Sequence, residues 1–188
     1  MATKDRILDV AEQLMSEKGY AGTSVAAVCK AAEVSVTSLY WHFGSKEGLL
    51  ASVMERGADR WFAALPRGDA DTMLAEGSKA VAGDPLFLRL CYLLSLEAQD
   101  DERASALVQR VRGQAHEYFR EVITTVLAAE HPPEFAKAAA GRLTPFAVAY
   151  SDGCFFASQV EPAKTDLEQM YSDLFVALRA LAKEQAHA

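Results

Sequence analysis

The stretch from residue 23 to residue 50, TSVAAVCKAAEVSVTSLYWHFGSKEGLL, constrains the fold more than any other part of the chain. Its capping residues and apolar spacings predict three short helices in direct succession. The first is expected over residues 25–32, with Thr23 or Ser24 as its N-cap, because a hydroxyl oxygen can accept from the unpaired amides of a first turn. Its apolar residues fall three or four apart, so one face can pack against a neighbour.

The second helix is short and has two unlike faces. Residues 33–35 turn the chain, and Ser35 is well typed to cap a helix over residues 36–43. Leu39 and Phe43 share one face of this helix and are expected to pack inward. The outward side chains are small hydroxyls, aromatic rings and an imidazole. Such groups pack poorly, but they can reach base edges and phosphates in a major groove.

Gly44 and Ser45 end the second helix, and a third is expected from Lys46 to Phe62. Lys46 falls in its first turn, where a cation opposes the helix dipole. A phosphate held by the ammonium group and the free amides of the turn would explain that placement. This third helix is long enough to act as a lever between the first helices and the rest of the chain.

The run VAAVCKAAEVSVTSLYWHFGSKEGLL is similar to the DNA-binding signature of the TetR family of bacterial transcriptional regulators, above all in SLYWHFGSKEGLL. The resemblance is close over about the first 50 residues, and beyond them it is one of architecture. It implies a homodimer that binds double-stranded operator DNA, usually as a repressor, and lets go when a small molecule enters the C-terminal domain. It also implies a set of DNA-contacting residues, with Lys46 on a backbone phosphate: Thr23, Ser35, Thr37, Ser38, Tyr40, Trp41, His42 and Lys46.

Three positions leave alternatives open. Thr23 is either a phosphate contact, as the resemblance implies, or a plain N-cap that needs no DNA. Glu33 stands where the family commonly has a turn glycine, and a non-glycine residue disfavours positive φ, so a different turn geometry is possible. Val36 stands where a basic or polar residue often begins the recognition helix, which puts a direct contact at that position in doubt.

The apolar periodicity predicts an all-α chain of about nine helices. The resemblance implies a helix-turn-helix DNA-binding domain over residues 1–48 and a ligand-binding and dimerisation domain over residues 49–188. The Pro, Gly and Asp content of residues 66–71 marks a boundary. The run LFLRLCYLLSLEA, residues 86–98, is apolar nearly all round and is expected to be the central buried helix of the second domain.

The last two helices carry more apolar surface than one small domain core needs. They are expected over residues 134–160 and from a capping box of Thr165 and Glu168 onward. Pairing them with their copies in a second subunit would make a four-helix bundle, with packing inside one subunit as the alternative. The expected dimer contacts are Ala149, Gly153, Phe156, Ala157, Val160, Met170, Leu174 and Leu178.

A helical domain rich in aromatic side chains can hold a mostly apolar cavity with a few orienting polar groups. We therefore expect a largely apolar small-molecule effector, whose identity the residues do not reveal. The expected lining combines aromatic, aliphatic and polar side chains: Trp61, Phe62, Phe87, Cys91, Tyr92, Ser95, His116, Phe119, Ile123, Phe146 and Tyr150.

Charge argues against a nonspecific nucleic-acid binder, because the net charge is −7. The first 60 residues hold seven Lys and Arg against eight Asp and Glu, so this part is nearly neutral and the remainder carries about −6. DNA affinity would then depend on local placement of Lys46 and of helix N-termini. The chain shows no apolar signal region and no run long enough to span a bilayer, so a cytoplasmic, nucleoid-associated protein without a membrane partner is expected.

No catalytic residue, metal ligand set or cofactor is expected. The sequence lacks G-x-S-x-G, a P-loop and a Gly-rich dinucleotide loop, so we expect no enzyme. Cys29, Cys91 and Cys154 are too far apart in sequence for paired zinc spacing and are expected to be buried thiols, with redox sensing as the other possibility. The alternative function is a helical adaptor that kept the fold and lost DNA binding.

Overall fold

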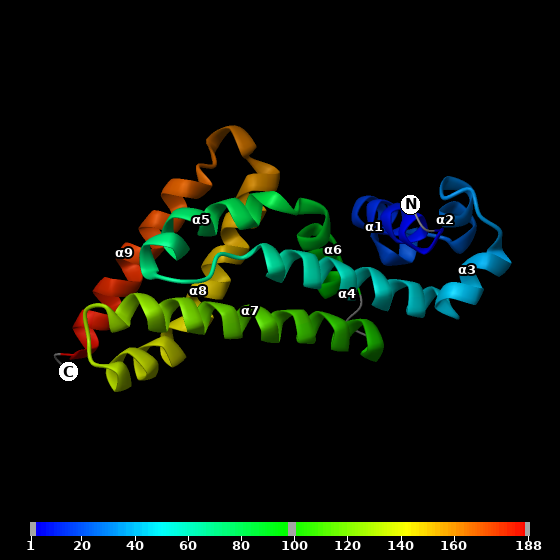
Figure 1. Cartoon of the computed structure of the whole chain (residues 1–188). Coiled ribbons are helices and arrows are strands. Elements are labelled where there is room, and N and C mark those ends of the chain that lie inside the picture. The colour runs from blue at the N-terminus through cyan, green and yellow to red at the C-terminus, as the bar shows by residue number, and fades with distance from the viewer. Residues whose placement is uncertain (1–2, 98–100, 187–188) are drawn as a thin grey trace. The chain divides into compact units, whose positions relative to one another are not determined.

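The computed structural model describes residues 3–97 and 101–186. Over these residues the chain forms α-helices and one short 3-10 helix joined by turns and loops, and no strand occurs among them. This confirms the expected fold class (Figure 1). The elements are α1 (Thr3–Gly22), α2 (Val25–Ala31), α3 (Val36–Phe43), α4 (Lys46–Ala64), α5 (Ala70–Gly83), α6 (Pro85–Glu97), α7 (Glu102–Ala128), α8 (Pro133–Val160), η1 (Pro162–Lys164) and α9 (Leu167–Ala186).

The chain forms two compact units that interleave in sequence. Unit 1 comprises Met1–Ala64 and Asp84–Val111, and unit 2 comprises Leu65–Gly83 and Arg112–Ala188. The expected DNA-binding domain, residues 1–48, lies within unit 1, which also takes in α4, α6 and the first part of α7. None of the described helices is long and apolar enough to cross a membrane.

In unit 1, α1 packs against α2, α4 and α6, and α3 packs against α2 and α4. The expectation that residues 86–98 form the central helix of a second domain is therefore wrong: α6 belongs to unit 1, and residue 98 lies outside the described residues. The physical reason is that α6 packs mainly against α1 and also fits closely against α4. A Cβ atom added at Gly57 would lie 2.4 Å from the Phe87 ring, so only a glycine lets this ring sit against α4.

A buried carboxylate ties the helices of unit 1 together. Glu12 on α1 is 5% exposed, and its two carboxylate oxygens accept from Arg56 at 3.2 Å and from Arg60 at 2.6 Å, both on α4. Arg60 also reaches Asp84 at 2.6 Å, and Asp84 in turn accepts from the Phe87 amide at the start of α6. Because these carboxylates pair with it, the pKa of Arg60 is raised. The charged network therefore fixes α1, α4 and α6 as one body.

In unit 2, α9 packs against α5 and α8. Figure 1 shows α8 and α9 running in opposite directions from the turn that holds η1. Arg112 of α7 pairs with Asp152 of α8 at 2.7 Å, and the Tyr118 hydroxyl donates to the Pro66 carbonyl at 3.0 Å. The expected capping box of Thr165 and Glu168 is wrong.

Asp166 caps α9 in its place. Its carboxylate accepts from the Gln169 amide at 3.0 Å, and its carbonyl accepts the Met170 amide. The Thr165 hydroxyl instead donates to the Glu161 carbonyl. A carboxylate next to the first turn is the better cap because its charge also favours the helix N-terminus.

Candidate DNA-binding surface

The helix-turn-helix begins with two serine caps, as the sequence predicts. Ser24 accepts from the Ala27 amide and Ser35 from the Ser38 amide, each at 3.1 Å, so each serine starts its helix one residue later. Between them Glu33 has φ 52, in the left-handed region. The turn therefore keeps the geometry that usually calls for glycine, and Glu33 bears its conformational cost.

The two faces of α3 separate as expected. Leu39 is fully buried and Phe43 is 9% exposed, so they anchor α3 on the unit. On the other side Thr37 and Tyr40 are exposed, and Ser38 and His42 are half-buried. The structure thus brings four expected DNA-contacting side chains onto one short helix, and none of the four is buried.

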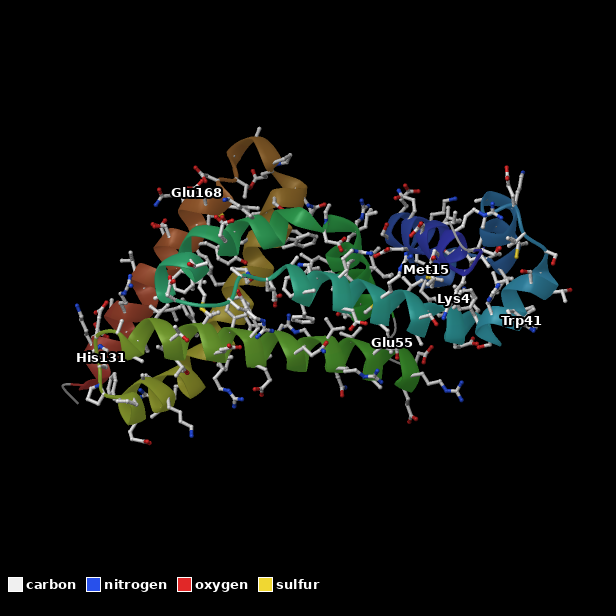
Figure 2. All side chains as sticks on the ribbon, viewed as in Figure 1. Lys4, Met15, Trp41, Glu55, His131 and Glu168 are labelled. Atoms are coloured by element: carbon white, nitrogen blue, oxygen red, sulfur yellow. The ribbon has the colours of Figure 1, made fainter. Side chains whose placement is uncertain are left out.

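Trp41 is the most exposed large hydrophobic side chain among the described residues, at 80%. Figure 2 shows it at the outer edge of unit 1. Its ring meets the His42 imidazole edge-on, with 4.7 Å between the centroids. Because most of this large apolar side chain is exposed, it is a candidate contact for an external partner.

Lys46 opens α4 directly beside α3. Ser45 caps this helix by accepting from the Gly48 amide at 3.1 Å. The Lys46 ammonium lies over the Tyr20 ring, and the Tyr20 hydroxyl donates to Glu47 at 3.4 Å. Burial, reinforced by the Glu47 charge, raises the pKa of Tyr20 to about 12, so its hydroxyl stays protonated. Sequence reasoning missed Tyr20, because no local pattern links it to a lysine so far along the chain.

Thr23 is a correction to the expected contact set. Its side chain is 1% exposed, and its hydroxyl lies 2.9 Å from the Gly19 carbonyl and 3.1 Å from the Leu14 carbonyl. Gly19 has φ 73 at a kink within α1, and Thr23 holds that kink closed. Neither expected role, phosphate contact or N-cap, fits this geometry, since the hydroxyl is buried and Ser24 is the cap.

The expected effector-site residues of unit 1 range from buried to exposed. Phe87 is fully buried against Gly57, and the exposed Ser95 donates its hydroxyl to the Cys91 carbonyl within its own helix. Phe62, Cys91 and Tyr92 are half-buried. Trp61 is 7% exposed, and its indole N–H has no acceptor within the described part of the chain, so it retains one unused donor.

In unit 2 the expected effector-site residues differ in burial. Phe119 and Ile123 are buried, while His116 and Tyr150 are half-buried. Burial raises the pKa of Tyr150. Phe146 is 42% exposed, so its expected inward orientation is wrong. The apolar residues of α8 cover so much of the helix that periodicity alone could not separate its buried positions from its exposed ones.

The expected dimer residues divide in the same way. Leu174 and Leu178 are 1% and 2% exposed and belong to the core of unit 2, so they are wrong as contacts between subunits. The small residues Ala149 and Gly153 are exposed, Ala157 and Met170 are half-buried, and Phe156 and Val160 are exposed. Val176 on α9 is also exposed, at 63%, and was not expected.

Comparison with known families and relatives identifies the helix-turn-helix. Residues 7–53 match the family described as "Bacterial regulatory proteins, tetR family". The HTH-type transcriptional regulator AcrR of Shigella flexneri is 31% identical over 110 residues, which cover 58% of this chain and 47% of AcrR. The HTH-type transcriptional regulator UidR of Escherichia coli K12 is 38% identical over 58 residues, which cover 31% of this chain and 30% of UidR. The chain thus spans less than half the length of each of these two relatives.

Solved structures extend the likeness of fold to nearly the whole chain. A transcriptional regulator from Pseudomonas aeruginosa PAO1 superposes with a TM-score of 0.75 at 20% identity, covering 96% of this chain and 90% of that one. Residues 7–53, which match the family, hold the serine caps, the turn at Glu33 and the outward face of α3. Over residues 7–53, which hold this N-terminal helix-turn-helix, the chain is similar to the tetR family of bacterial regulatory proteins.

Proposed function

We propose that this chain is a sequence-specific DNA-binding transcriptional regulator, a repressor that a small-molecule effector releases from its operator. One observation carries the proposal: α3 buries Leu39 and Phe43 on one face, and its opposite face is open to an external partner. Groups of this kind read a major groove when the helix that bears them docks there. Regulators of this family are not enzymes, and the proposal needs no catalytic group.

Thr37, Ser38, Tyr40, Trp41 and His42 are the base- and backbone-contacting residues in this proposal. Ser35 lies at the helix N-terminus, where its amide neighbours can approach a phosphate. Lys46 contacts a backbone phosphate from the adjoining helix. Because α3 itself carries no Lys or Arg, this phosphate contact supplies much of the charge-dependent affinity.

A second copy of the chain completes the proposed regulator. Phe156 and Val160 on α8 and Val176 on α9 are each at least 60% exposed, and exposed apolar side chains of this size favour burial against another surface. We propose that α8 and α9 pair with their copies in a homodimer. Two recognition helices could then reach successive major grooves, roughly 34–36 Å apart.

The effector in this proposal binds in unit 2 and is largely apolar. Phe119 and Ile123 offer apolar surface there, and His116 and Tyr150 offer half-buried polar groups that can orient a ligand. An effector that favours a form with wrongly spaced recognition helices must weaken DNA binding. By linkage, bound DNA weakens effector binding by the same factor. We propose α4 as the lever, since it starts at Lys46 and ends where the chain passes into unit 2.

A gel-shift titration on the DNA upstream of the chain's own gene, at two salt concentrations, tests the proposal. We expect one sequence to bind and the affinity to fall as salt rises. Lys46→Ala should weaken binding to all sequences alike and lower the salt slope by about one, while Thr37→Ala or Ser38→Ala should change the preference among sequences. Failure of the folded dimer to bind any DNA selected from a random pool would reject the proposal in favour of an adaptor.

A further inference from the structure

The chemistry that α3 lacks is as informative as the chemistry it has. Its sequence, VTSLYWHF, contains no Arg or Lys, the side chains that read guanine in a bidentate manner, and no Asn or Gln, which read adenine. It also lacks the Asp or Glu that could accept from cytosine. Three of the four distinctive edge patterns of the major groove therefore have no dedicated reader on this helix.

What α3 does present is apolar surface. Val36 is 45% exposed, Tyr40 is 43% exposed and Trp41 is 80% exposed, while Thr37 adds an exposed methyl group. Val36 and Tyr40 are four residues apart, so they are neighbours on the same face of the helix. Val36 follows directly after the Ser35 cap, in the N-terminal turn that enters the groove in helix-turn-helix complexes.

Thymine is the base that offers an apolar group in the major groove, its C5 methyl. Resting on the proposed function, we infer that Val36 is a specificity-determining residue that packs against the C5 methyl of an operator thymine, with Tyr40 beside it. The branched side chain of Val36 is short and stiff, so it fills a fixed position relative to the helix axis. The operator half-site thus has thymine where the start of α3 meets it.

Deoxyuridine tests the inference, because its base, uracil, differs from thymine only by the missing C5 methyl group. The operator is first selected from a random pool, and each thymine of a half-site is then replaced in turn by deoxyuridine. We expect about a fourfold loss of affinity at the contacted thymine, the value for one buried methyl group, and little change elsewhere. Val36→Ala should lose about as much on the thymine operator and nothing further on the deoxyuridine operator.

Leu96→Ala is the matched control, since Leu96 is 74% exposed but lies on α6. This substitution should leave the affinity for both operators unchanged. Because Val36 is exposed, Val36→Ala should also leave the thermal unfolding curve in place, so a loss of affinity cannot come from unfolding. Binding that is insensitive to every deoxyuridine would overturn this inference and leave the proposed function standing. Failure to bind any selected DNA would overturn the proposed function, and this inference with it.

Discussion

The ammonium nitrogen of Lys46 lies 4.3 Å from the centroid of the Tyr20 ring, a cation–π contact between the first turn of α4 and α1. A free lysine side chain samples many rotamers, and the ring limits them. Tyr20 is therefore a positioning residue for the proposed phosphate contact. Tyr20→Leu should weaken operator binding about two- to fivefold and lower the salt slope, as expected for loss of a moderately exposed cation–π contact.

Tyr20→Phe is the matched control for that measurement. It keeps the ring under Lys46 and removes the hydroxyl that donates to Glu47. Fluorescence-anisotropy titrations over a series of salt concentrations should give the wild-type slope for the phenylalanine variant. An equal loss in both variants, with an unchanged slope, would show that Tyr20 acts only through folding.

Gly48 is held against the end of α3. A Cβ atom there would lie 2.1 Å from the Phe43 carbonyl oxygen, and a backbone atom cannot move aside without shifting α3. Gly48→Ala should lower the free energy of unfolding by about 1–3 kcal/mol and also reduce DNA affinity, because the recognition helix must rotate. Gly113→Ala in α7 has open space around the new methyl and should raise stability by about 0.5–1 kcal/mol. Urea denaturation of both variants gives the comparison, and equal stability would contradict the close contact.

Glu33 carries a positive φ of 52 in the helix-turn-helix. Glu33→Gly should raise the free energy of unfolding by up to about 1 kcal/mol, since glycine adopts this region without the steric cost of a Cβ. Glu33→Ala removes the charge but keeps the Cβ, so it should give no such gain. If the alanine variant matched the glycine variant in chemical denaturation, charge rather than backbone conformation would be the cause.

The two tryptophans of the chain differ sharply in exposure, with Trp41 at 80% and Trp61 at 7%. Trp61→Phe leaves Trp41 as the only tryptophan, and its fluorescence should be strongly quenched by acrylamide. Bound operator should protect it from the quencher, whereas DNA of scrambled sequence at the same salt concentration should not. Unchanged quenching in a complex that a gel shift confirms would remove Trp41 from the interface.

Local rules explain which expectations hold. Ser35, Leu39 and Phe43 were predictable because a cap and an i, i+4 pair are decided within one turn of helix. Thr23 was not predictable, because its hydroxyl is used by carbonyl groups four and nine residues earlier, across the kink at Gly19. Likewise, the apolar run of α6 predicted burial but not its partners, which are α1 and, through the fit of Phe87 against Gly57, α4.

The three cysteines also show what residue spacing can and cannot predict. Cys29 and Cys154 are buried as expected, while Cys91 is half-buried. Burial raises the pKa of Cys154 to about 11, so this thiol is almost wholly protonated at neutral pH and reacts slowly with electrophiles. A redox role for Cys154 is thereby disfavoured, a conclusion that residue spacing alone could not give.

The last prediction contrasts an exposed and a buried apolar residue of the last two helices, α8 and α9. Phe156 is 67% exposed and Leu174 is 1% exposed, so substitutions at the two positions should fail in different ways. Phe156→Glu should leave the protomer folded but place a charge in the proposed interface, so light scattering should report a monomer and operator affinity should fall steeply. Leu174→Ala should lower the free energy of unfolding by about 2–5 kcal/mol through a cavity in unit 2. Lys137→Glu, at an exposed position on the same helix as Phe156 but away from the apolar stripe, should change neither property. A Phe156→Glu variant that remained a dimer would show that residue 156 lies outside the interface, because burial of an unpaired carboxylate is too costly for a stable dimer.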